Sequence, residues 1–154
     1  MTEIKVASQL TVTIRANQKD IYEFFTSPER INQCVVDVVE FELLSQNKAS
    51  WTLKEKRDLG IVFQPKYTLS YTGDGEKHIS WVSESSNLEI EGSVTIDNNS
   101  HSCRIAFHEV ISFDLPISKT MGLLAKTVAK HEIALGNKRY LNQVKEQLES
   151  LVVT

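Results

Sequence analysis

The sequence predicts an α+β fold in which an antiparallel sheet of about six or seven strands is followed by one long C-terminal helix. Apolar and polar residues alternate through most of residues 4–113, which is the period of half-buried strands. Short polar turns such as Gly73-Asp74-Gly75 and Asp97-Asn98-Asn99 join these segments, so neighbouring strands should run antiparallel. After Leu115-Pro116 the apolar spacing changes to three and four, the period of a helix.

The chain should open with a long strand and two short helices. Its first apolar residues occupy even positions: Ile4, Val6, Leu10, Val12 and Ile14. Ser8 would be the one polar residue on that inward face. Asn17 can cap a helix from Gln18 to about Phe25. Pro28 suits the first residue of a second short helix, which we expect to end near Gln33.

Six further strands are expected between Val35 and Phe113. One of them should place Trp51, Leu53 and Glu55 on a common face. The last should place Glu109 on the face of its apolar residues, which are Cys103, Ile105, Phe107, Ile111 and Phe113.

The C-terminal helix should run from about Ser118 to Leu151, a length of roughly 50 Å. Its first apolar stripe comprises Ile117, Met121, Leu124, Val128, His131 and Leu135. After Gly136, a candidate bend, a stripe slightly out of phase comprises Leu141, Val144, Leu148 and Leu151.

Composition favours one ordinary globular domain over residues 1–154. The 154 residues are 41% hydrophobic and 24% charged, and the net charge is −3 without a basic stripe, which argues against a nucleic-acid partner. Cys34 and Cys103 have no CxxC partner and should be buried reduced thiols. We expect a cytoplasmic protein, because residues 1–5 do not resemble a secretory signal.

Membrane insertion and bound cofactors are not expected either. No run approaches the roughly 18 apolar residues of a membrane span, which leaves room only for transient membrane contact. His101 and Cys103 are the only close histidine–cysteine pair, and no glycine-rich phosphate loop occurs. We therefore expect no metal and no nucleotide cofactor. The oligomeric state is left open.

The order of elements resembles the helix-grip fold of the START-like (SRPBCC) superfamily. Its local features are the segment from Asp20 to Arg30, in which a helix precedes a proline-led second helix, and the Pro116-led C-terminal helix. That superfamily includes polyketide cyclase/dehydrase-like proteins, coenzyme Q-binding proteins and carriers of plant hormones and lipids. The resemblance covers nearly the whole chain, although residues 45–50 lack the glycine-rich loop of some plant members. It implies a sheet that curls around the long helix and encloses a hydrophobic cavity.

Three polar residues occupy positions where the pattern expects apolar ones, and they are the candidates for chemistry. Glu55 and Glu109 share faces with apolar strand residues, and His131 is the polar member of the first helix stripe. A bulge or a solvent-exposed strand end could instead turn either carboxylate outward, and His131 could be a partly exposed packing residue. We expect Glu109 and His131 to lie close together across the cavity, because the last strand leads directly into the helix.

The predicted ligand-binding residues combine aromatic side chains with these polar exceptions. They are Trp51, Leu53, Tyr67, Leu69, Tyr71, Trp81, Phe107, Glu109, Met121, Leu124, Val128 and His131. The alternative for the aromatic members is plain core packing.

The function favoured by this pattern is the binding or transport of a small hydrophobic ligand, such as a lipid, an isoprenoid quinone or a polyketide, without catalysis. One alternative is a polyketide cyclase or dehydratase that uses a cavity glutamate or histidine as acid and base. A second is a protein-interaction module, which an apolar outer sheet face and a filled interior would favour.

Overall fold

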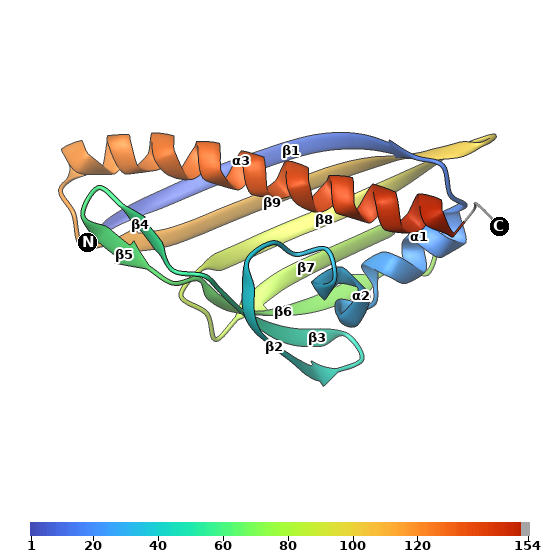
Figure 1. Ribbon diagram of the computed structural model, residues 1–154, viewed down its shortest axis with the longest axis horizontal. Helices are drawn as coiled ribbons and strands as arrows, with labels where there is room; N and C mark the ends of the chain where they lie inside the picture. Colours follow the sequence, from blue (N-terminus) through green and yellow to red (C-terminus); the bar gives the residue numbers. More distant parts are fainter. Residues whose placement is uncertain (152–154) are drawn as a thin grey trace.

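The computed structural model describes residues 1–151 and contains the predicted sequence of elements (Figure 1). Strand β1 (Thr2–Ile14) is followed by helices α1 (Gln18–Phe25) and α2 (Pro28–Asn32). The strands after α2 are β2 (Val38–Ser45), β3 (Lys48–Leu53), β4 (Lys56–Asp58), β5 (Ile61–Phe63), β6 (Lys66–Gly73), β7 (His78–Glu84), β8 (Glu89–Asn99) and β9 (Ser102–Leu115). Helix α3 (Lys119–Ser150) ends the described chain.

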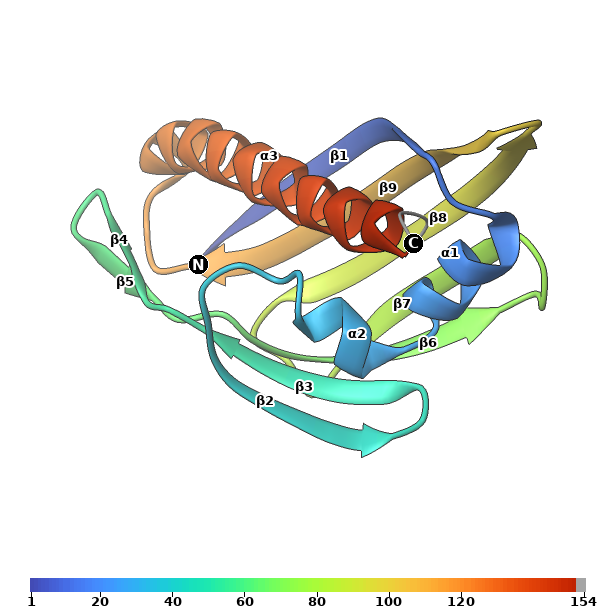
Figure 2. The ribbon, with the colours of Figure 1, turned by 45° about the vertical axis from the view of Figure 1, so that its right-hand side comes forward.

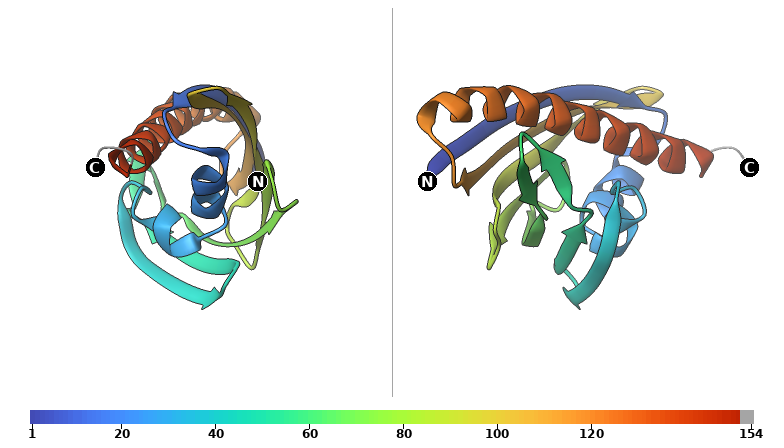
Figure 3. Two further views of the ribbon diagram at one scale, coloured as in Figure 1. Left: turned by 90° about the vertical axis from the view of Figure 1, so that its right-hand side faces the viewer. Right: turned by 60° about the vertical axis from the view of Figure 1, so that its left-hand side comes forward.

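Seven strands form one antiparallel sheet in the order β1-β9-β8-β7-β6-β3-β2. The sheet curves around α3 (Figure 2). In the left view of Figure 3, along α3, α1 and α2 lie on the concave side. This arrangement confirms the predicted α+β helix-grip fold.

Local capping explains where the helices begin. The side chains of Asn17 and Ser27 accept hydrogen bonds from the backbone N–H groups of Asp20 and Arg30, which satisfies one free donor at each helix start. Ser118 does the same for α3 through the N–H of Met121. Helix α3 continues through Gly136 without interruption.

The prediction that a single strand runs through Glu55 is wrong. Strand β3 ends at Leu53, where its pairing with β6 stops at Thr52 and Lys66. Pro65, the residue before β6, has no N–H to extend the ladder. The chain instead forms the separate β4–β5 hairpin (Figure 3, right), which the sequence analysis did not predict. Its turn places Leu59 and Gly60 in the left-handed backbone region.

The inward face of the first half of α3 also differs from the predicted stripe. Gly122 and Ala125 are buried there, whereas Met121 and Leu124 are exposed. A Cβ atom on Gly122 would lie 2.7 Å from the Thr2 Cγ2 atom, so α3 approaches β1 closely enough to require a small residue. Hydrophobicity does not mark such positions.

The core consists of two clusters on the concave side of the sheet. The larger one joins α1 and the sheet to Leu141, Val144 and Leu148 of α3. The smaller one joins Ile4, Val6 and Leu115 to Ala125 and is flanked by partly buried residues of β5 and α3. As predicted, Ser8 is buried, and both cysteines are buried and free.

Candidate ligand-binding site

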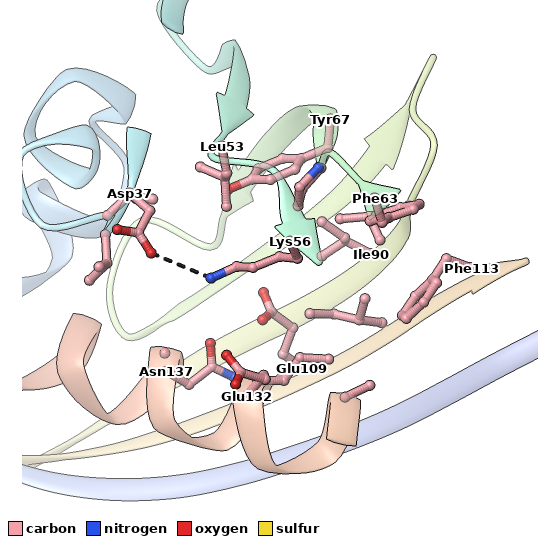
Figure 4. Close-up of a pocket in the computed structure, with 18 of the residues that line it drawn as sticks. Asp37, Leu53, Lys56, Phe63, Tyr67, Ile90, Glu109, Phe113, Glu132 and Asn137 are labelled. Atoms are coloured by element: carbon pink, nitrogen blue, oxygen red, sulfur yellow. Dashed lines mark hydrogen bonds and ion pairs between the residues drawn. The ribbon is translucent and has the colours of Figure 1, made fainter. Parts of the chain in front are cut away.

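A cavity of about 340 Å³ lies between the concave sheet, the β4–β5 hairpin and α3 (Figure 4). Nine of the twelve predicted ligand-binding residues line it: Trp51, Leu53, Tyr67, Leu69, Tyr71, Trp81, Phe107, Glu109 and Val128. The other three, Met121, Leu124 and His131, are exposed and lie outside the lining. Their inward placement is therefore wrong, and His131 does not face the cavity that Glu109 lines.

The remaining polar candidate, Glu55, is also outside the cavity. It follows the end of β3, and its half-exposed carboxylate pairs with Arg57 at 3.2 Å. The expectation that Glu55 shares the inward face of Trp51 is wrong for this reason.

Aromatic rings form a continuous row that crosses the sheet wall of the cavity and ends at Tyr140 on α3. The ring centroids of Tyr71 and Trp81 are 5.8 Å apart, those of Trp81 and Phe107 5.7 Å, and those of Phe107 and Tyr140 6.4 Å. Trp51 and Tyr67 form a further stacked pair at 5.7 Å. Two of these pairs follow from sheet register, because Tyr71 stands opposite Trp81 and Trp51 opposite Tyr67.

Glu109, on the inner wall, contacts Trp81 across a glycine. Trp81, Gly92 and Glu109 lie in one row across β7, β8 and β9. Since Gly92 has no side chain, the Trp81 indole extends over β8 and donates a hydrogen bond from Nε1 to Glu109 Oε2 at 3.0 Å. A Cβ atom on Gly92 would lie 2.3 Å from that indole. The absence of a side chain at Gly92 thus leaves the space in which the tryptophan reaches the carboxyl group.

Burial raises the pKa of Glu109 from 4.5 to about 7, because a charged carboxylate loses its hydration there. The hydrogen bond from Trp81 opposes the shift, and so does the nearby Asn137 amide, which favours the charged form. Within residues 1–151 no cation forms an ion pair with Glu109, and the buried Asn137 Nδ2 atom has no well-formed hydrogen bond. The cavity therefore holds a carboxyl group that changes charge near neutral pH.

Three tyrosine side chains surround this carboxyl group. Burial raises the pKa values of Tyr67, Tyr71 and Tyr140 well above 10, and the nearby Glu109 adds to each shift. Their hydroxyl groups remain neutral at physiological pH and can donate or accept hydrogen bonds.

Charged residues gather where the cavity opens. Lys56 of β4 pairs with Asp37 at 3.4 Å, which ties the hairpin to the loop after α2 (Figure 4). Asp58 of the hairpin and Glu132 and Arg139 of α3 complete the charged lining.

Two residues of α3 that the sequence analysis missed, Asn137 and Tyr140, line the cavity. The apolar stripe at the end of the helix could have predicted the inward position of Asn137. Steps of four backward from Leu141 reach Asn137, Ile133, Ala129 and Ala125, and all four line the cavity.

Residues 1–151 contain neither a candidate metal cluster nor a candidate membrane-spanning helix. No group of three or more histidine, cysteine, aspartate or glutamate side chains there could hold a metal ion. No helix in the same range is both long enough and apolar enough to cross a membrane.

Comparison with known proteins connects this architecture to solved structures. No protein-family model and no curated protein sequence matches the chain. A protein from Thermus thermophilus is similar over 97% of this chain and 99% of its own, with 13% identity and a TM-score of 0.77. A START superfamily protein from Mycobacterium smegmatis is similar over 94% of this chain and 98% of its own, with 13% identity and a TM-score of 0.68.

A third similar structure is the di-domain ARO/CYC protein StfQ from the steffimycin biosynthetic pathway. The similarity covers 98% of this chain and 53% of StfQ, with 10% identity and a TM-score of 0.68. At these identities the likeness concerns the fold. The chain has the START-like helix-grip fold.

Proposed function

We propose that the protein binds and carries a small hydrophobic molecule in the cavity between its sheet and α3. The observation that carries this proposal is a space of about 340 Å³ lined mainly by aromatic and aliphatic side chains. Moving an apolar ligand there from water gains about 25 cal/mol per Å² of buried apolar surface. Lipids, isoprenoid quinones and polyketides are the classes of ligand that we propose to test first.

A cavity-filling substitution tests this proposal. Ala129→Phe puts a ring into the space, whereas Ala134→Phe adds the same ring to an exposed position on α3 outside the lining. We expect Ala129→Phe to weaken binding of the neutral probe N-phenyl-1-naphthylamine about tenfold or more, and Ala134→Phe to change it less than about twofold. Both tryptophans of the chain line the cavity, so their fluorescence reports occupancy.

Native mass spectrometry against a lipid extract supplies an independent measurement. The wild-type protein should retain an apolar molecule that Ala129→Phe does not retain. If neither the probe nor any extracted molecule binds to the wild-type protein, the carrier proposal fails.

Glu109 supports a second candidate function, acid–base catalysis on a confined substrate. A pKa of about 7 suits a group that both takes and gives protons at neutral pH. Two structural neighbours are di-domain ARO/CYC proteins, which is why cyclisation or dehydration of a polyketide is the reaction to test. If the wild-type protein turns over a poly-β-ketone substrate and Glu109→Gln does not, an enzymatic function is supported. If the wild-type protein and the variant convert the substrate no faster than the reaction without protein, an enzymatic function is contradicted.

The outer face of the sheet gives the protein-interaction alternative less support than the cavity gives the carrier function. Small polar residues occupy much of its centre, including Ser70, Thr72, Ser80 and Ser93. A cavity is present rather than a filled interior.

A further inference from the structure

The carboxyl group of Glu109, which lies partly buried in the cavity wall, has no positive partner among the described residues. Burying a carboxylate is costly unless a cation or several hydrogen bonds compensate the lost hydration. Trp81 supplies one hydrogen bond, and the Asn137 amide faces the same group without a well-formed bond. The protein itself therefore leaves the charge of this carboxyl group incompletely compensated.

The rest of the charged lining does not supply the missing cation. The acidic residues of the lining outnumber the basic ones; they are Asp37, Asp58, Glu109 and Glu132 against Lys56 and Arg139. Lys56 is already paired with Asp37, and Arg139 is exposed. A negatively charged ligand would meet Glu109 without a cation beside it, whereas a positive ligand would be attracted by both the opening and the inner wall.

The aromatic row provides a second reason to expect a positive group. Tyr71, Trp81, Phe107 and Tyr140 follow one another at centroid distances of 5.7–6.4 Å, next to Glu109. Neighbouring rings are tilted by 38–56° to one another, so their faces are not covered by parallel stacking. Aromatic faces attract organic cations, most strongly where water is excluded.

We infer that the ligand is an amphiphile whose polar end is an organic cation, an ammonium or quaternary ammonium group, held between Glu109 and the aromatic row. This inference rests on the proposed carrier function. The apolar body of the ligand would occupy the aliphatic part of the cavity, near Ile90 and Ile111. A primary ammonium would donate hydrogen bonds to Glu109, whereas a trimethylammonium would be held by charge and ring contacts.

A series of probes with one tail and different ends tests this inference. The probes are decyltrimethylammonium, decylamine, decanol and decanoate, used below their micelle concentrations and followed by tryptophan fluorescence. At pH 8 we expect both cations to bind about tenfold or more tightly than decanol, and decanoate to bind most weakly. A preference for decylamine over decyltrimethylammonium would indicate hydrogen bonding, and the reverse would indicate ring contacts.

The preference should disappear when Glu109 loses its charge. A carboxyl group with a raised pKa is charged above about pH 7 and neutral below it, so cation binding should weaken as the pH falls from 8 to 5.5. No histidine lines the cavity within the described residues. The titratable groups that face Glu109 or the opening are Tyr67 and Tyr71 of β6, Tyr140, Glu132 and Arg139 of α3, Lys56 and Asp58 of the hairpin, and Asp37. Decanol serves as the neutral reference at each pH.

Two substitutions separate this effect from a general change of charge. Glu109→Gln should abolish the tenfold preference for cations, measured as the ratio of cation to decanol affinity within the same variant. Glu91→Gln is the matched control, because Glu91 is exposed on the same sheet and outside the cavity lining.

The two proposals can fail separately. If decanol binds as well as the cations at pH 8, or if Glu109→Gln keeps the preference, the inference is overturned and the carrier proposal stands. If none of the four probes binds, the inference is overturned, and the carrier proposal fails only if N-phenyl-1-naphthylamine and the lipid extract also give no binding.

Discussion

At the scale of single residues, Glu109 determines both the chemistry and part of the energetics of the cavity. It lies partly buried beside aromatic rings, and the loss of hydration there raises its pKa from 4.5 to about 7. Because the pKa is higher in the folded protein than in the unfolded chain, the native state holds the proton more tightly. Stability should therefore fall as the pH rises from about 4.5 to about 7, and stay level above that range.

Glu109→Gln should remove this dependence. At pH 8 the neutral side chain avoids the cost of a buried charge, so the variant should be more stable than the wild type by up to about 3 kcal/mol. Near pH 4.5 the wild-type carboxyl group is protonated when folded and half protonated when unfolded, so most of the difference should vanish. Urea denaturation at both pH values measures this, and an equal difference at the two would contradict it.

At the scale of elements, the register of β7, β8 and β9 brings Trp81 to Glu109 across Gly92. Gly92→Ala puts a Cβ atom 2.3 Å from the indole, so the ring must move and its hydrogen bond to Glu109 must lengthen. We expect a loss of about 1–3 kcal/mol in stability and a change in tryptophan fluorescence. Thermal and urea unfolding of the variant give the measurement.

Gly136→Ala is the control for that substitution. Nothing lies within 4 Å of a Cβ atom at Gly136, which stands within α3. Alanine should therefore raise stability by about 0.5–1 kcal/mol through helix propensity. If both glycine variants lost the same stability, a specific role for the space over Gly92 would be excluded.

Periodicity predicted the elements well wherever one face of an element is buried and the other is not. It placed Trp51, Tyr67, Trp81 and Glu109 on the concave side, since strand residues alternate faces strictly. It failed for Met121 and Leu124, because α3 meets β1 through small residues that carry no hydrophobic signal.

Other parts of the site depend on events that a local pattern does not encode. Glu55 left the expected face because the pairing of β3 with β6 ended at Lys66, next to Pro65. The row of Trp81, Gly92 and Glu109 depends on the register of three strands, which their separate sequences do not specify. The raised pKa of Glu109 follows from that same assembly.

At the scale of the whole molecule, the two halves of α3 are held differently. The second half buries Leu141, Val144 and Leu148 in the larger core. The first half contacts the smaller cluster through Ala125 and spans the cavity beside the β4–β5 hairpin. A region with fewer buried apolar contacts opens locally at lower free energy, so the first half and the hairpin should be the less stable part.

Hydrogen exchange of the ligand-free protein should reveal this division. Amides of residues 123–136 and 56–63 should exchange faster than those of residues 140–148, which lie in the larger core. Saturation with a bound probe such as N-phenyl-1-naphthylamine should slow exchange mainly in the first two ranges, because the ligand adds the apolar contacts that they lack. At a probe concentration of 100 times Kd, binding should also raise global stability by about 2.7 kcal/mol. Uniform exchange along α3, or protection confined to its second half, would place ligand binding elsewhere than between the hairpin and the first half of the helix.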